Sequence, residues 1–250
     1  MKMWKKAAAL VMALGMTVGF TACGGGSNGG GNGGIGGAPI KGEELETGSW
    51  STAWAASLSA TNIEVEYESY FYEGYEGAEE SGWEEYSESV AISLADNKIH
   101  ITGTAEEKDS EGDEDLEDFE TYYGEVDGQL YEWYTAEYYE EGEWDVECRG
   151  AMDPTFMTGY GLIANLMGLD IDISSYALWE QYTQYEGGVY VLQDGDTTYK
   201  FAFKDNLLSA VEIEYADSGV EDDETWREES IIRVTMSYGN ASVDELPAIE

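Results

Sequence analysis

Apolar and polar residues alternate over much of this chain, which is the pattern of half-buried β-strands. Ile63, Val65 and Tyr67 alternate with glutamates, and the same two-residue period recurs at 90–101 and 119–136. It returns at 189–215 and from 231 to 238. Pairs of residues that suit tight hairpin turns separate several of these runs, namely Asp96-Asn97, Asp127-Gly128, Asp194-Gly195 and Asp205-Asn206.

This pattern predicts a mainly β fold with an antiparallel meander of about ten to eleven strands. Flat open sheets of that size are uncommon, so we expect the sheet to curve strongly, as a half-barrel. Two acidic segments, 106–120 and 217–229, are predicted as loops, and Pro247 is expected to stop the last strand. Residues 174–182 are compatible with either helix or strand.

Two segments have helical spacing instead. Trp50, Trp54 and Leu58 predict a short helix within 44–59. Asp153 is a suitable N-cap and Pro154 a suitable first residue for a second helix that ends at Gly168. Its apolar stripe, which we predict to lie on the concave face of the sheet and to bind an apolar ligand, consists of Phe156, Tyr160, Ile163 and Met167.

Composition narrows the possible partners. The chain of 250 residues has a formal net charge of −42, which repels nucleic acid and attracts cations. Such charge would favour disorder in a chain with little apolar content, but 42% of the residues are hydrophobic and 13% aromatic. We therefore predict a folded acidic protein with no nucleic-acid partner.

The N-terminal segment has the layout of a secretory signal. Lysines at 2, 5 and 6 precede an apolar run over 7–20, which is too short to cross a bilayer as a helix. The sequence Phe20-Thr21-Ala22-Cys23 resembles the lipobox of bacterial lipoproteins. The resemblance implies cleavage before Cys23 and attachment of lipid to that cysteine.

The expected organisation follows from this segment. Residues 1–22 are a signal peptide, and 23–41 contain the lipidated cysteine and a glycine-rich tether that behaves as a flexible coil. Residues 42–250 are expected to form one domain. The predicted location is the extracytoplasmic face of the cell membrane, with the membrane as a partner through lipidated Cys23.

The order of predicted elements is similar to that of the bacterial carriers and receptors of the outer-membrane lipoprotein localisation pathway. The likeness rests on that order, on the hairpin Val126-Asp127-Gly128-Gln129-Leu130-Tyr131 and on the closing strand followed by Leu246-Pro247. It implies a half-barrel sheet whose concave face is covered by helices and encloses an apolar cavity for acyl chains.

Enzymatic chemistry finds little support. His100 is the only histidine, and it alternates with Ile99 and Ile101, which predicts a solvated side chain or one at a sheet edge. No Gly-x-Ser-x-Gly nucleophile motif is present outside the glycine-rich tether. Cys148, the cysteine left after lipidation, shares a strand face with Trp144 and Val146 and is expected to be a small buried side chain. We predict a non-enzymatic protein with no cofactor.

Acidic segment 106–120 raises the question of calcium. Counted from Asp109, an EF-hand loop would need glycine at its sixth place, where Glu114 stands. A solvated loop is favoured, with weak Ca²⁺ binding left open.

Two binding functions remain from the sequence. The first is a lipid or other apolar ligand held in a cavity between the sheet and the helices. The second is a surface module for a glycan or a protein, which would use exposed aromatic rings and carboxylates. Aromatic residues crowd one predicted hairpin and are equally suited to cross-strand packing, namely Tyr122, Tyr123, Tyr131, Trp133, Tyr134, Tyr138 and Tyr139.

Overall fold

The computed structural model describes residues 38–77, 81–135, 144–151, 153–166, 175–221 and 224–248. These residues form an antiparallel sheet of eleven strands and three short helices, which confirms the prediction of a mainly β meander. The helices are α2 (Trp50–Leu58), α3 (Gly159–Leu166) and α4 (Tyr176–Trp179). The strands are β1 (Ile63–Glu76), β2 (Ser81–Ala95), β3 (Lys98–Asp109), β4 (Glu114–Val126), β5 (Gln129–Tyr134), β6 (Asp145–Ala151), β7 (Gln184–Glu186), β8 (Val189–Asp194), β9 (Thr197–Lys204), β10 (Leu207–Glu221) and β11 (Glu224–Tyr238).

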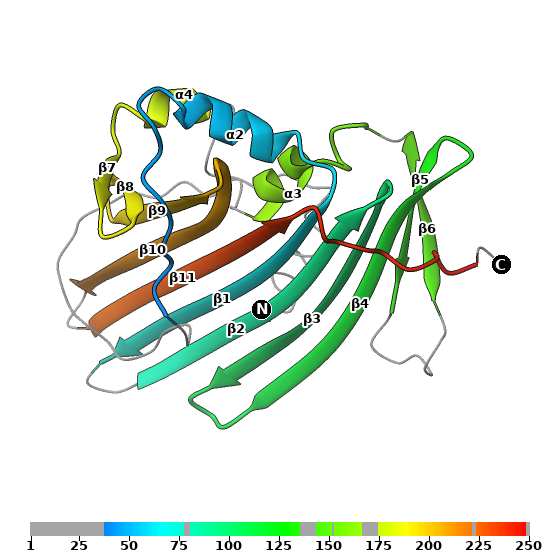
Figure 1. Cartoon of the computed structure of the whole chain (residues 1–250). Helices are drawn as coiled ribbons and strands as arrows, with labels where there is room; N and C mark the ends of the chain where they lie inside the picture. Colours follow the sequence, from blue (N-terminus) through cyan, green and yellow to red (C-terminus); the bar gives the residue numbers. More distant parts are fainter. Residues whose placement is uncertain are drawn as a thin grey trace.

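The meander starts in the middle of the sheet. Strands β1 to β6 follow one another outward to one edge, the chain crosses to the other edge, and β7 to β11 return inward until β11 pairs with β1. Helices α3 and α4 belong to the crossing segment between the two edges (Figure 1). Strands β6 and β7 are not paired with each other, so the sheet is open.

The hairpin turns follow from their residue types. Asp96, Asn97, Asp205 and Asn206 all have positive φ, between 52° and 59°, which Asp and Asn tolerate better than other side chains. Asp127 and Gly128 likewise have φ values of 52° and 79°. These turns confirm three of the predicted hairpins, while the turn after β8 lies one residue later than predicted, at 195–196.

The two predicted acidic loops are wrong, because strands continue through them. In the first, β3 and β4 pair as far as Lys108 and Glu114. In the second, β10 and β11 pair as far as Glu221 and Glu224. Glutamate has a low β propensity, but each strand is extended by the register of its neighbours, and the carboxylates of these segments are divided between the two faces of the sheet. The last strand ends at Tyr238, well before Pro247, so the proline does not stop it.

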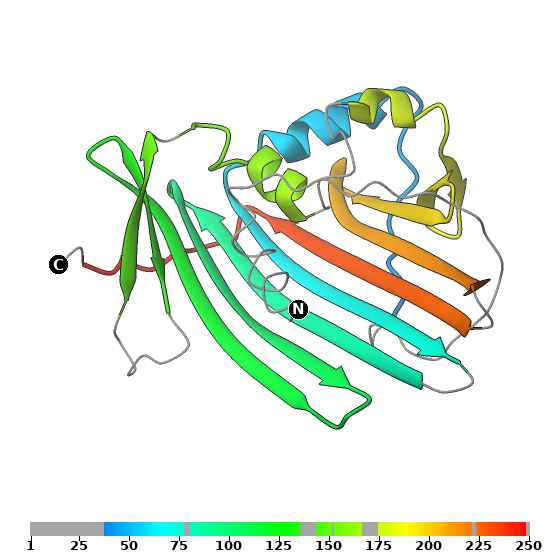
Figure 2. The same ribbon diagram turned by 180° about the vertical axis from the view of Figure 1, so that it is seen from behind.

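The core lies between the helices and one face of the sheet, hereafter the helix-bearing face (Figures 1 and 2). Trp50 and Trp54 of α2 are 1% and 0% exposed and contact the rings of Phe201 and Phe203, with centroid distances of 5.2 to 6.2 Å. The Ser57 hydroxyl accepts a 2.8 Å hydrogen bond from the Leu208 amide, so α2 is fixed to β10. No helix among the described residues is long and apolar enough to cross a bilayer.

Helix α3 begins later than predicted. Asp153 accepts hydrogen bonds from the amide and hydroxyl of Thr155 and so forms a local turn rather than capping a helix. The helix begins at Gly159, where a Cβ would collide with the carbonyl oxygen of Ser57 in α2. Only glycine therefore allows the two helices to approach this closely. Further along, residues 174–182, which the sequence predicted as either helix or strand, include the short helix α4.

Candidate functional site

The helices α2, α3 and α4 cover one end of the helix-bearing face, and the long strands extend beyond them (Figure 1). We call the remaining part of this face the helix-free half. It consists of those residues whose side chains point to the helix-bearing face in the ranges 69–76, 82–88, 105–109, 115–119, 215–219 and 226–230. Residues opposite one another in the register share a face, and alternate residues of a strand point to opposite faces. The positions follow from the pairs Ser69 with Glu88 and Phe71 with Tyr86.

The helix-free half combines aromatic rings with carboxylates. The register of six strands places these rings on it: Phe71, Tyr75, Tyr86, Phe119, Tyr215 and Trp226. It also places these carboxylates there: Glu73, Glu84, Glu88, Glu107, Asp109, Asp115, Glu117, Asp217 and Glu228. The basic residues of the same six strands all have the opposite parity and therefore lie on the opposite face of the sheet, namely Lys98, Lys108, Arg227 and Arg233.

Glu88 is the most unusual residue of this half. Glu88 is 4% exposed, and its Oε2 atom has no hydrogen-bond partner among the described residues. Burial raises the pKa of its carboxyl from 4.5 to about 7, and an interaction with Tyr86 offsets this only in part. A carboxylate that is buried without a cation is costly, so this residue titrates near neutral pH.

The neighbours of Glu88 respond to its charge. Burial raises the pKa of Tyr86, and the negative charges of Glu88, Glu117 and Glu107 raise it further. The pKa of Tyr67 is raised for the same two reasons, first burial and then the negative charge of Glu88. Burial followed by nearby carboxylates also raises the pKa of Glu107. The groups around Glu88 therefore accumulate negative potential.

Two other buried glutamates have the partners that Glu88 lacks. Glu132 accepts a 2.5 Å hydrogen bond from the Tyr123 hydroxyl and forms an ion pair with Arg149. Glu212 accepts hydrogen bonds of 2.9 Å from Lys200 and 2.6 Å from Arg233. Burial by itself raises the pKa of Glu212, but the hydrogen bonds from these two bases outweigh it and lower the pKa below its ordinary value.

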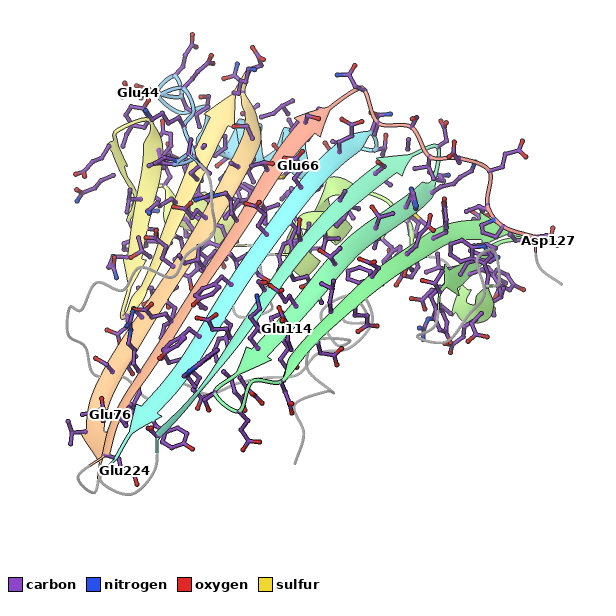
Figure 3. The ribbon with its side chains drawn as sticks, turned by 90° about the horizontal axis from the view of Figure 1, so that it is seen from below. Glu44, Glu66, Glu76, Glu114, Asp127 and Glu224 are labelled. Carbon is purple, nitrogen blue, oxygen red and sulfur yellow. The ribbon has the colours of Figure 1, made fainter. Side chains whose placement is uncertain are left out.

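The opposite face of the sheet is also acidic but better neutralised. Figure 3 looks onto this face and labels Glu66 near the start of β1 and Glu114 at the start of β4. A pocket of about 460 Å³ lies there between β1, β2 and β3 and is bordered by Tyr70, Glu85 and Lys108. Lys108 is 2.9 Å from Glu106 and 3.4 Å from Glu114, so the only ammonium group of this pocket is engaged by carboxylates of the chain itself.

A second pocket lies at the tips of β1, β2 and β11. It has a volume of about 730 Å³, and the aromatic residues Tyr72 and Trp83, which share the face opposite the helices, are among the residues that line it. Arg227 lies over the Tyr72 ring, 5.5 Å from its centroid, and forms an ion pair with Glu229.

The structure separates the residues that the sequence predicted as a ligand site. Ile163 is 1% exposed and belongs to the core, whereas Tyr160 is 40% exposed. Phe156 is half-buried and contacts the Tyr123 ring at a centroid distance of 5.4 Å. The buried residues of this segment include Met157 and Leu162, so its apolar stripe is rotated from the predicted one, because the helix begins six residues after Asp153. Met167 and Cys23 lie outside the described residues.

His100 lies on the opposite face from Ile99 and Ile101, as predicted, but not at a sheet edge. Its strand, β3, lies inside the sheet, and its ring stacks on Tyr122 at 4.1 Å. Its Nε2 atom is 2.7 Å from Glu120. The histidine is therefore held by an acid and a ring in a cross-strand contact.

Cys148 is exposed, so the prediction of a buried thiol is wrong. The reason is topological, since β6 is an edge strand of the sheet. The segment considered for calcium is a β-hairpin, in which Asp109 accepts hydrogen bonds from the amides of Glu111 and Asp113 and so closes the turn. Among the described residues, no group of three or more His, Cys, Asp and Glu side chains is arranged to hold a metal ion.

The sequence contains a signal for Glu88 that the search for candidate residues did not use. Glu88 is in phase with Val90, Ile92 and Leu94, so the two-residue period that buries these three residues also directs a carboxylate inward. A charged residue in the apolar phase of a strand is worth noting as a functional candidate.

Comparisons with known proteins add no assignment. A scan against protein-family models finds no match, and a search of curated proteins finds no match either.

Proposed function

We propose that this chain is a membrane-anchored, extracytoplasmic lipoprotein whose β-sheet domain binds a small ligand without chemical conversion. The anchor is supported by the basic and apolar signal-like segment and by Cys23 directly after Ala22. Two acyl chains on one cysteine would hold such a protein stably at a membrane, whereas one chain is marginal. The glycine-rich segment before Pro39 would give the domain distance from the lipid surface.

The proposed architecture is the half-barrel of the lipoprotein-carrier family, with the helices on the concave face. An eleven-stranded open sheet supports this, because a sheet of that size must twist and curl. The position of α3 and α4 in the segment that crosses from β6 to β7 supports it as well, since this segment must span the sheet.

The observation that carries the binding function is the helix-free half. Under the helices, aromatic side chains already contact one another, as Trp54 does with Tyr176, Trp179 and Phe201. Phe71 and Tyr86 lie opposite each other on the same face, and neither belongs to the core that packs against the helices. A ligand would place its apolar part against these rings.

The carboxylates of this half define the rest of the ligand. An acyl chain alone would have to desolvate them without compensation, which is unfavourable. An amphipathic ligand with an apolar part and a polar part that interacts with carboxylates suits the surface better. We therefore narrow the predicted class of ligand from any lipid or apolar molecule to an amphipathic one.

The test is native mass spectrometry of the full-length chain purified in detergent, followed by extraction and identification of any bound small molecule. A stoichiometric adduct should be present in the wild type, absent from Phe71→Ala, and retained by Tyr72→Ala, whose side chain lies on the other face of the same strand. An adduct that is equally abundant in the three proteins, or absent from all of them, would refute a ligand on the helix-free half.

The tip pocket supports the second candidate function, binding of a glycan. Tyr72 and Trp83 carry aromatic rings of the kind that stack on sugars. Retention of the wild type, but not of Trp83→Ala, on an immobilised glycan would establish this function. Equal elution of both proteins in the void volume of every column would exclude it.

A further inference from the structure

Glu88 is a buried carboxylate that has no counter-charge among the described residues. Of the three buried glutamates in the part of the chain that the structure describes, Glu132 has Arg149 and Glu212 has both Lys200 and Arg233. Glu88 is 4% exposed, and its Oε2 makes no hydrogen bond with the described residues. The Tyr86 hydroxyl beside it is buried as well and makes no hydrogen bond of normal geometry among the described residues, although it lies close enough to lower the pKa of Glu88 in part. These two groups form an unsatisfied polar pair in an otherwise well-paired sheet.

None of the described strands supplies a base to this place. The four basic residues of the surrounding strands lie on the opposite face, where three of them are already paired: Lys108 with Glu106, Arg227 with Glu229, and Arg233 with Glu212. Charge neutralisation at Glu88 therefore cannot come from these strands, and a cation from solution can supply it. A net charge of −42 attracts cations of every kind to the molecule, so selectivity has to come from the shape and chemistry of the site.

Two observations favour an organic cation over a metal ion. Among the described residues, no three His, Cys, Asp or Glu side chains converge as metal ligands would. In addition, aromatic rings border Glu88 on its own face: Tyr67 and Phe71 on β1 and Tyr86 on β2. Ammonium groups are attracted to the faces of such rings as well as to carboxylates.

Further carboxylates extend the acidic surface away from Glu88. Glu107 lies opposite Tyr86, and Glu117 lies opposite Ala105, which is itself opposite Glu88. Neighbouring strands are about 4.8 Å apart, so these carboxylates and rings alternate over short distances across the sheet. A molecule with several ammonium groups joined by short methylene chains matches this alternation of charged and apolar contacts.

We propose that the helix-free half is a polyamine-binding site in which Glu88 receives one ammonium group, the rings of Phe71 and Tyr86 contact the methylene chain, and Glu107 and Glu117 receive the other ammonium groups. The proposal rests on the proposed function, since it names the ligand class of the same surface. The amine donates hydrogen bonds to Glu88, so the unpaired Oε2 atom gains a partner when the site is filled.

The site should be sensitive to pH. Protonation of Glu88 removes the charge that receives the ammonium group, so affinity should fall as pH decreases through about 7, the pKa that burial gives this carboxyl. The other titratable groups that face it are Tyr67 on β1, Tyr86 on its own strand, Glu107 on β3 and Glu117 on β4. The pKa values of both tyrosines are raised by burial, so these residues stay neutral over this range.

The test is isothermal titration of the full-length chain with spermine, at about 0.15 M salt to screen attraction to exposed charges. At about pH 8 we expect saturable binding with one site per chain. Glu88→Gln should weaken it by about tenfold or more, because a charge-assisted hydrogen bond is lost in a buried place. The matched control, Glu66→Gln, removes the same charge from an exposed residue of the opposite face and should change affinity less than twofold.

A second variant and a second ligand complete the test. Tyr86→Leu keeps an apolar side chain without the ring and should weaken binding several-fold; its far-ultraviolet circular dichroism shows whether the sheet is intact. Equal affinity of the wild type and Glu88→Gln for spermine would overturn the proposal, since only general charge attraction would remain. Binding of Ca²⁺ with the same dependence on Glu88 would also overturn it and assign the site to metal ions. If spermine fails while mass spectrometry finds another ligand that depends on Phe71, the proposed function stands and the ligand class is wrong.

Discussion

The substitution Glu88→Gln should make the protein more stable at neutral pH and change little in mild acid. The folded protein holds the carboxyl pKa at about 7, compared with the ordinary value of 4.5. Between these two pH values, the folded state keeps a proton that the unfolded state has released. The stability that Glu88 contributes is therefore fully present below pH 4.5 and is lost as pH rises through 7.

The size of the effect follows from the two pKa values. They differ by about 2.5, and each pH unit between them corresponds to about 1.36 kcal/mol, so about 3 kcal/mol is lost in total. Between about pH 5 and about pH 8 the expected loss is roughly 2.5 kcal/mol, because part of the titration lies below this range. Glutamine has nearly the same shape and no titration, so the variant should not show this loss.

The assay is urea-induced unfolding, monitored by tryptophan fluorescence, of the wild type and Glu88→Gln at both pH values. The quantity to compare is the difference in unfolding free energy between variant and wild type, since this difference cancels the repulsion among the other carboxylates. It should increase by roughly 2.5 kcal/mol from acid to neutral pH, while Glu66→Gln, an exposed residue of the opposite face, should show no such trend. A difference for Glu88→Gln that stays constant with pH would refute the conclusion that this carboxylate is buried without a partner.

Three further substitutions test the packing and pairing of the fold. Arg149→Met leaves the buried carboxylate of Glu132 without its cation and should destabilise the protein by about 3 to 5 kcal/mol in urea unfolding; a loss under about 1 kcal/mol would mean that the Tyr123 hydroxyl suffices. Gly159→Ala places a Cβ against the Ser57 carbonyl and should lower the melting temperature through a loss of about 1 to 3 kcal/mol, unless α2 and α3 can separate without cost. Trp54→Ala empties the centre of the core and should cost about 3 to 5 kcal/mol by the same denaturant assay; an unchanged midpoint would contradict the central position of this ring.

Two glycines on the helix-bearing face of the sheet are covered by aromatic rings from neighbouring strands. Gly103 lies under the ring of Phe119, and Gly219 lies under the indole of Trp226, so that in each case an added Cβ would meet an aromatic side chain from the neighbouring strand. The aromatic residue covers backbone that glycine leaves exposed in a strand. This pairing could not be predicted from either residue alone, because the two become neighbours only in the final register.

Local pattern determined much of this protein. The two-residue period located the strands, and paired Asp, Asn and Gly residues located the hairpin turns, because both signals act within a few residues. The spacing of Trp50, Trp54 and Leu58 likewise indicated α2. Where local chemistry competed, the prediction was wrong: Asp153 closed a turn with Thr155, and α3 began at Gly159 with a different buried stripe.

Only the tertiary structure decided the rest. The acidic segments became strands because neighbouring strands extended their register, as the pair Glu221 with Glu224 shows. The order of the strands in the sheet determines three further features: the burial of Glu88, the pairing of Glu132 with Arg149, and the absence of the neighbouring basic side chains from the helix-free half. The sequence determines which face of its own strand a side chain points to. The cation that neutralises a buried carboxylate can come from a residue far away in the chain, and only the fold determines whether the two lie close enough to pair.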